Sequence, residues 1–155
     1  MEHLRTLSCG ETGLIRVDDK FYLVSTSMHY VPGCPIAVSE DLVNWEMAGY
    51  ALDRYDEDPK YDMQGGNLYL NGAWATTIRH HNGKFYVGFC TPYGWGRETG
   101  HFSICIADDV KGPWERTIFP EYLYDPGLFF DEDGNTIEAS LCTEYTPEQL
   151  QKVET

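Results

Sequence analysis

Basic residues are scarce in this sequence of 155 residues, where 11 Lys and Arg stand against 25 Asp and Glu. The formal net charge of −14 repels phosphate backbones and anionic lipid surfaces, which argues against nucleic acids and membranes as partners. No apolar run approaches the roughly 18 to 20 residues of a membrane span. Residues 1–10 lack the apolar stretch of a secretory signal, so the sequence predicts a cytoplasmic protein.

Cysteines are few, odd in number and never arranged as C-x-x-C. A disulfide framework uses an even number of cysteines, and the common zinc sites use close pairs. Reduced thiols in the core are therefore the favoured interpretation for Cys9, Cys34, Cys90, Cys105 and Cys142. We expect no cofactor and no bound metal.

Helical patterns are nearly absent, and the one candidate lies in the tail at 146–150, with Thr146 as N-cap. Short runs rich in Val, Ile, Phe and Tyr instead predict strands within 14–25, 78–90, 101–107 and 128–139. Asp18-Asp19 and Asn82-Gly83 interrupt the first two runs and predict hairpin turns there.

Three segments resemble one another and begin at Glu11, Trp74 and Asp125, which are separated by 63 and 51 residues. A unit of this length holding about four short strands is typical of a β-propeller blade. The sequence therefore predicts an all-β fold, a partial propeller of about two and a half blades. The predicted first blade spans about 11–70 and the second about 74–120, with the start of a third at about 125–140 and a tail at 141–155. The alternative is a β-sandwich whose segments are similar by accident.

If each unit opens with the innermost strand, Glu11, Trp74 and Asp125 converge at one mouth of the central channel. Carboxylates beside an aromatic platform suit sugar chemistry, because apolar sugar faces stack on indole and carboxyl groups of different pKa supply acid and base. The alternative for each acid is a solvated turn residue.

Several motifs follow one another in order over about residues 9–140. They are Gly13–Val24, Tyr30–Ile36 and Ser39–Trp45 in the first predicted blade, Trp74-Ala-Thr-Thr-Ile-Arg, Gly100–Asp109 and Gly112-Pro-Trp in the second, and Tyr124–Gly134 in the third. Together they resemble glycoside hydrolase family 43, the β-xylosidases and α-L-arabinofuranosidases with a five-bladed propeller.

The resemblance implies an inverting mechanism, with Glu11 at the position of the base and Asp125 as the carboxylate that orients and tunes pKa. At Glu11 the chain reads E-T-G where the family has D-P-S, which lengthens the acid by one methylene. Trp74 and Met28 would line the sugar subsite, Met28 standing where the xylosidases often carry Phe. The family's acid motif, E-G-P, has no match in the chain.

Several other residues have a possible role at the site and a simpler structural alternative. His29 lies in a loop near the predicted pocket, and Arg97, in the glycine-rich segment 94–100, either contacts sugar or belongs to a surface turn. The His80-His81 pair is interpreted as part of a hairpin rather than a metal site, and the acidic run 53–62 as a solvated loop rather than a calcium site.

Two functions follow from these residues. The first is a fragment or subunit of a glycoside hydrolase for xylose- or arabinose-containing oligosaccharides, inactive alone because the acid is missing. The second is a non-catalytic carbohydrate-binding or remnant propeller protein; a propeller glycosidase of another class, such as one acting on fructans, is a less favoured third. Because half a propeller leaves an open sheet edge, we also expect self-association or a complementing chain.

Overall fold

The described residues form eleven strands and one short 3-10 helix, η1 (Pro59–Asp62). The structure is a computed structural model that describes residues 12–69, 71–93 and 99–130, and by their backbone alone 136–140 and 152–153. The all-β fold class is confirmed. Glu11, Arg97 and the helix expected at 146–150 lie outside the described residues.

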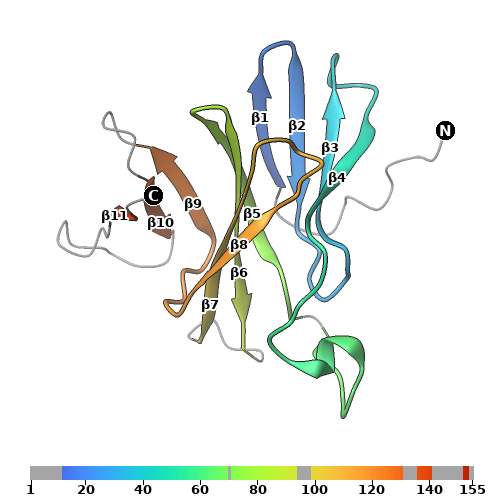
Figure 1. Cartoon of the computed structure of the whole chain (residues 1–155), viewed down its shortest axis with the longest axis vertical. Coiled ribbons are helices and arrows are strands. Elements are labelled where there is room, and N and C mark those ends of the chain that lie inside the picture. The colour runs from blue at the N-terminus through green and yellow to red at the C-terminus, as the bar shows by residue number, and fades with distance from the viewer. Residues whose placement is uncertain (1–11, 70, 94–98, 131–135, 141–151, 154–155) are drawn as a thin grey trace.

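Three antiparallel sheets lie side by side, with the second sheet in the middle (Figure 1). The first has the order β1 (Thr12–Val17), β2 (Lys20–Ser25), β3 (Gly33–Ser39), β4 (Glu46–Leu52). The second has the order β5 (Trp74–His81), β6 (Lys84–Pro92), β7 (Gly100–Ala107), β8 (Glu115–Phe119). The third joins β9 (Pro126–Phe130), β10 (Thr136–Ser140) and β11 (Lys152–Val153), with β10 between the other two.

The two hairpins expected from turn residues are present. Val17 pairs with Lys20 across Asp18-Asp19, and His81 pairs with Lys84 across Asn82-Gly83. Asn82 and Gly83 both have positive φ, 48° and 79°, the conformation of a two-residue turn whose twist matches that of the flanking strands.

The first strands of the three sheets are neighbours, β1 beside β5 and β5 beside β9. A Cβ at Gly13 would lie 2.9 Å from the backbone nitrogen of Ile78, so the lack of a side chain lets β1 approach β5. One step further round, a Cβ at Gly88 would lie 3.1 Å from Leu128. These contacts put the beginnings of β1, β5 and β9 at one end of the molecule.

A β-bulge near the start of β5 changes which residues of β1 and β5 are structurally equivalent. Trp74 pairs with Cys90 but Thr77 pairs with Gly88, so three steps along β5 face two along β6. The extra residue reverses the faces of all that follow in β5. As a result Ile15 and Ile78, which align without a gap in sequence, pack from opposite sides into the same core.

Two apolar clusters join the sheets. The larger lies between the first and second sheets and includes Val24, Ile36, Ile78, Val87 and Phe89, all fully buried. The smaller lies between the second and third sheets and is built on Phe102 and Leu128. Each sheet thus buries a face against its neighbour, as stacked blades do.

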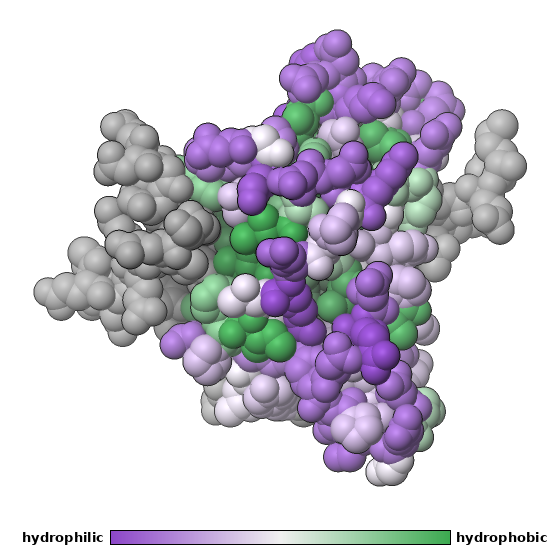
Figure 2. Space-filling model, viewed as in Figure 1, coloured by the Kyte–Doolittle hydropathy of each residue, from purple (hydrophilic) through white to green (hydrophobic). Residues whose placement is uncertain are grey.

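Hydrophilic residues cover the upper end and the lower right of the face in Figure 2, with apolar residues gathered toward its middle. Among the described residues, no helix has the length and apolar character needed to cross a membrane.

Candidate functional site

Trp74 and Asp125 stand at the beginnings of neighbouring inner strands, and the thiol of Cys90 contacts both. Cys90 Sγ donates to the Trp74 carbonyl oxygen at 3.7 Å and accepts a hydrogen bond from the backbone N–H of Asp125. Burial raises the pKa of this thiol to about 11, and the nearby Asp125 carboxylate adds to the rise. The two residues that sequence analysis placed at equivalent positions are therefore close together in space.

Met28 joins the same end of the molecule through its backbone. Its N–H donates to the Ala73 carbonyl at 2.9 Å, and its own carbonyl accepts from the Ala73 N–H at 3.1 Å. This isolated bridge ties the loop after β2 to the residue before Trp74. Met28 and Trp74 thus belong to one continuous stretch of backbone contacts.

The His29 ring lies between those of two tyrosines and is tilted against both. It lies 4.2 Å from that of Tyr30 and 4.5 Å from that of Tyr69, centroid to centroid. Both tyrosines are exposed, whereas His29 is half-buried. The imidazole therefore supports an exposed aromatic group next to Met28 in the chain.

Three residues at this end have a left-handed backbone that non-glycine residues seldom adopt: Met28 (φ 50°), Ala75 (φ 49°) and Asp125 (φ 50°). Such conformations persist only where the surrounding structure enforces them, and they concentrate at functional sites. Their presence beside Trp74 is independent support for a site here.

The predicted base, Glu11, and the predicted sugar contact, Arg97, lie outside the described residues. The strand registers nevertheless show which position of the first repeat corresponds to Trp74 in the second. Counting back from the two hairpin turns, the residue that corresponds to Trp74 is residue 11, once the bulge is allowed for.

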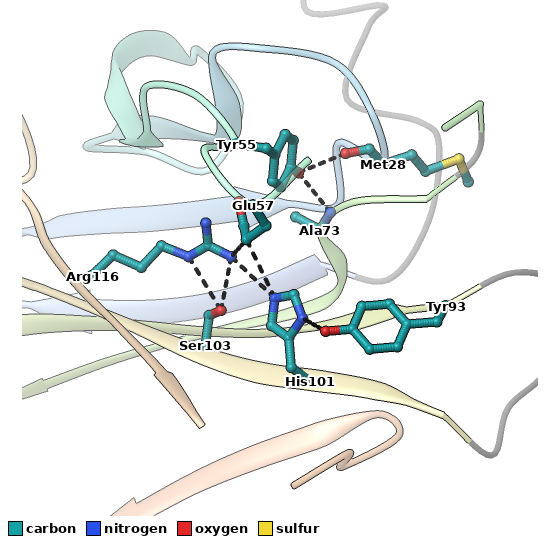
Figure 3. A network of polar contacts seen from close by, with 8 residues as sticks. All are labelled: Met28, Tyr55, Glu57, Ala73, Tyr93, His101, Ser103 and Arg116. Atoms are coloured by element: carbon teal, nitrogen blue, oxygen red, sulfur yellow. Dashed lines mark hydrogen bonds and ion pairs between the residues drawn. The ribbon is translucent and has the colours of Figure 1, made fainter. Parts of the chain in front are cut away.

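A second polar cluster, which sequence analysis did not find, connects the segment after β4 to the second sheet (Figure 3). Arg116, on β8, pairs with the Glu57 carboxylate at 2.5 Å and donates to the Ser103 hydroxyl at 3.0 Å. Its guanidinium lies over the rings of Phe89 and Tyr55, at 5.2 and 5.8 Å from their centroids. The Arg116 side chain is 15% exposed and that of Glu57 is 23% exposed.

His101, on β7, extends this cluster toward the residues that flank 94–98. Its Nε2 lies 3.2 Å from Arg116 Nη2 and 3.4 Å from Glu57 Oε1, and its Nδ1 lies 3.0 Å from the Tyr93 hydroxyl. His101 is buried. The imidazole thus bridges the ion pair and the last described residue before that segment.

Glu57 remains ionised in this cluster. Burial acts to raise its pKa, but hydrogen bonds from His101 and Arg116, together with the guanidinium charge, outweigh that effect and hold the pKa at about 2. The expectation of a solvated loop at 53–62 is therefore wrong for Glu57 and for the buried Tyr55. The burial of Tyr55 is not visible in the sequence, and no local pattern there distinguishes Glu57 from the acids on either side of it.

Within the described part of the chain, no group of three or more His, Cys, Asp or Glu side chains is arranged to hold a metal ion. The site is therefore described by its carboxylate, its aromatic groups and its backbone conformation.

Comparison with known proteins bears on this arrangement. Residues 10–137 match glycosyl hydrolases family 43. A xylosidase/arabinosidase of Butyrivibrio fibrisolvens is 40% identical over 131 residues, which are 80% of this chain and 23% of that protein. A non-reducing end alpha-L-arabinofuranosidase of Bacteroides ovatus is 37% identical over 121 residues, 77% of this chain and 22% of that protein. The chain spans about a fifth of the length of these relatives.

Solved structures of family 43 proteins are similar to this chain as well. A bifunctional family 43 protein of Bacteroides eggerthii superposes with a TM-score of 0.72 at 34% identity, over 83% of this chain and 16% of that one. A family 43 protein of Bacillus licheniformis superposes with a TM-score of 0.73 at 25% identity, over 86% of this chain and 27% of that one. These enzymes are five-bladed β-propellers, and this chain has the fold of part of one. On its matched motifs and its fold, the chain belongs to glycosyl hydrolase family 43.

Proposed function

We propose that this chain supplies one wall of the sugar pocket and two carboxylates of an inverting hydrolase for xylose- or arabinose-containing oligosaccharides. The observation that carries the proposal is the contact of one thiol, that of Cys90, with the backbones of both Trp74 and Asp125, which brings these two residues to one end of neighbouring strands. In the proposed pocket the indole stacks on a sugar ring and the carboxylate binds its hydroxyls. The names of the relatives, xylosidases and arabinofuranosidases, support this substrate class.

In the proposed mechanism Glu11 activates a water molecule as general base, and Asp125 orients the sugar and tunes pKa. Met28 and His29 line the pocket beside Trp74, and Arg97 contacts the sugar from the 94–100 segment. An inverting enzyme also needs a general acid, with the two carboxyls about 6.5 to 9.5 Å apart. Because none of the 155 residues stands in the family's E-G-P context, we assign the acid to another part of the complete enzyme or to another chain.

A non-catalytic carbohydrate-binding protein is the second candidate. It is favoured by the E-T-G segment, since the longer side chain of Glu11 displaces its carboxylate by roughly an ångström, and misplacement on that scale costs about 100-fold in rate. Both candidates share the Trp74 pocket and differ in whether a bond is cleaved.

Replacing Trp74 by alanine tests the pocket directly. We expect xylobiose or arabinobiose to bind the purified chain and the Trp74→Ala substitution to weaken binding about 10-fold, which corresponds to ~1.4 kcal/mol. The stacking of sugar on indole is the reason. Titration calorimetry or protein-detected NMR measures the change.

Trp45→Ala is the matched control for this experiment. Trp45 lies between β3 and β4, near the opposite end of the first sheet, where its indole N–H donates to the Leu42 carbonyl at 3.1 Å. Equal binding by wild type and Trp74→Ala, or equal weakening by Trp45→Ala, would be incompatible with a Trp74 pocket.

The free face of the first sheet suggests a partner. Leu14, Leu23, Ala37 and Met47 are cross-strand neighbours in a row over β1 to β4. Leu14 and Met47 are 50% and 47% exposed. The next residues along β1 and β2, such as Ile15 and Tyr22, pack into the core shared with the second sheet, so this row points away from it.

In the second sheet the equivalent row of residues is covered by a neighbouring sheet. Counting from the hairpin turns, the same positions are Ile78, Val87, Cys105 and Arg116, and the first three are fully buried against the first sheet. We therefore propose that the row on the first sheet binds another blade, and that copies of the isolated chain associate through it.

Light scattering tests this association. We expect a mass above the 17.7 kDa of one chain, because the exposed row of Leu14 and Met47 is removed from water on binding. Leu14→Gln should shift the mass toward that of one chain, whereas Val43→Gln, in the turn after β3 and 78% exposed, should not. A monomer of wild type that melts cooperatively would refute the proposal.

A further inference from the structure

The hydroxyl of Tyr55 lies between two segments of the proposed pocket wall (Figure 3). It donates to the Met28 carbonyl at 2.7 Å and accepts from the Ala73 N–H at 2.7 Å. Tyr55 is 2% exposed, so both bonds are shielded from water. A single oxygen atom thus joins the loop after β2 to the residue that precedes Trp74.

The backbone around this oxygen leaves no room for adjustment. Gly72 has φ 108°, and a Cβ there would lie 2.1 Å from the Met28 carbonyl oxygen and 2.8 Å from the Tyr55 hydroxyl. Only glycine allows the strand to come this close. The spacing between Met28 and Ala73 is therefore set by contacts on every side.

The Tyr55 ring is held from its other side by groups outside the pocket. The Tyr61 ring stacks on it at 4.3 Å, and the Arg116 guanidinium lies 5.8 Å from its centroid. Arg116 also pairs with Glu57, two residues after Tyr55. The outer strand of the second sheet therefore fixes the segment that carries Tyr55.

We propose that Tyr55 is a positioning residue, which sets the distance between the Met28 and Trp74 walls and is itself held by the Arg116–Glu57 pair. The part of this inference that concerns sugar rests on the proposed function. The part that concerns the backbone does not. Without the hydroxyl, the Ala73 N–H keeps only its 3.1 Å bond to the Met28 carbonyl, so the wall loosens and sugar binding weakens.

The test compares Tyr55→Phe with Tyr61→Phe. Both remove one phenolic oxygen from stacked, neighbouring rings, but the Tyr61 hydroxyl makes no hydrogen bond with the described residues. We expect Tyr55→Phe to speed hydrogen exchange of the Ala73 amide about 10-fold or more, measured by NMR, and to weaken xylobiose binding about 10-fold. Tyr61→Phe should change neither.

A loss of stability alone must not explain the weaker binding. Ile36→Val, in the fully buried core of the first sheet, removes one methylene far along β3 and serves as a destabilised variant that keeps its affinity. Measurements are made well below the melting temperature of each variant.

The outcomes separate the two claims. Unchanged Ala73 exchange in Tyr55→Phe overturns the positioning role, and so does unchanged affinity of that variant while wild type binds. Equal weakening by Ile36→Val or Tyr61→Phe also overturns it. If wild type binds no sugar, the proposed function fails, and Ala73 exchange alone decides whether Tyr55 sets the backbone spacing.

Discussion

Replacing Arg116 by methionine is expected to lower the free energy of unfolding by about 3 kcal/mol at neutral pH. The substitution removes the guanidinium that pairs with Glu57 and leaves a carboxylate that is 23% exposed, with the His101 imidazole in place of a permanent cation. It also removes a guanidinium from above Phe89. Removing one partner of a fully buried pair costs about 3 to 5 kcal/mol, and the partial exposure of Glu57 puts this case at the lower end. The melting temperature should fall by roughly 6 to 12 °C.

Arg54→Met is the matched control. Arg54 pairs with Asp56 at 2.7 Å in the same segment, but their side chains are 65% and 76% exposed. An exposed pair contributes about 0.2 to 1 kcal/mol, so this variant should melt close to wild type. Chemical denaturation of the three proteins gives the comparison. If Arg116→Met and Arg54→Met lowered the free energy of unfolding by similar amounts, the burial of the Arg116–Glu57 pair could not be the cause of its larger contribution.

The same pair predicts how the difference depends on pH. The folded-state pKa of Glu57, about 2, is below its ordinary value of 4.5, so the pair stabilises the fold above that ordinary value and ceases to do so as pH falls toward 2. The difference between wild type and Arg116→Met should therefore shrink between about pH 5 and pH 2. Other carboxylates common to both proteins, such as Asp41, cancel in this difference. A constant difference over that range would contradict the assignment to Glu57.

Local signals in the sequence account for much of the fold. Asn82-Gly83 and Asp18-Asp19 predict the two hairpins because these residues accept the backbone angles of tight turns. The strands within 101–107 and 128–139 follow from β-branched and aromatic residues. Propensity and turn chemistry act between near neighbours, so a single sequence displays them directly.

The β5 bulge could not be predicted in this way. Trp74-Ala-Thr-Thr-Ile-Arg looks like an ordinary strand start, and the extra residue is recognisable only when Trp74 is seen opposite Cys90. Without the bulge Ile15 and Ile78, which align without a gap, would have the same orientation in their blades, whereas they face each other across one core. Strand register depends on the partner strand, and the partner is chosen by tertiary packing.

The residues of the candidate site likewise differ in whether a local sequence pattern could reveal them. Trp74, Met28 and Asp125 were predicted as site residues from their place in a repeat and a family motif, and the structure puts them at one end of the inner strands. Glu57 and Arg116 were missed because they are distant in sequence and neither stands in a pattern. Their interaction exists only once β8 lies beside the segment after β4. In the sequence, nothing separates Glu57, whose ion pair is largely buried, from the neighbouring acids Asp56, Asp58 and Asp62, whose ion pairs are more exposed.

Catalysis provides the largest expected effect. The 155-residue chain alone should hydrolyse an unactivated xyloside or arabinoside at or near the background rate, because no residue in it matches the general acid that protonates the leaving group. An aryl glycoside with a good leaving group needs less acid assistance, so residual turnover should be sought there. When the later blades of a family 43 relative are joined to the chain or supplied as a second polypeptide, turnover of the unactivated substrate should appear.

In that completed protein the two carboxylates should behave differently. Asp125→Asn should lower kcat about 100-fold or more, since it removes the charge that orients and tunes the site, a contribution comparable to that of a general acid or base. Glu11→Asp should raise kcat, because the shorter side chain brings the carboxylate back to the family's reach. Rapid turnover of an unactivated disaccharide by the 155-residue chain itself, abolished by Glu11→Ala, would refute the claim that the chain contains no general acid. The acid would then have to be sought among Glu98, Glu144 and Glu148, which lie outside the described residues.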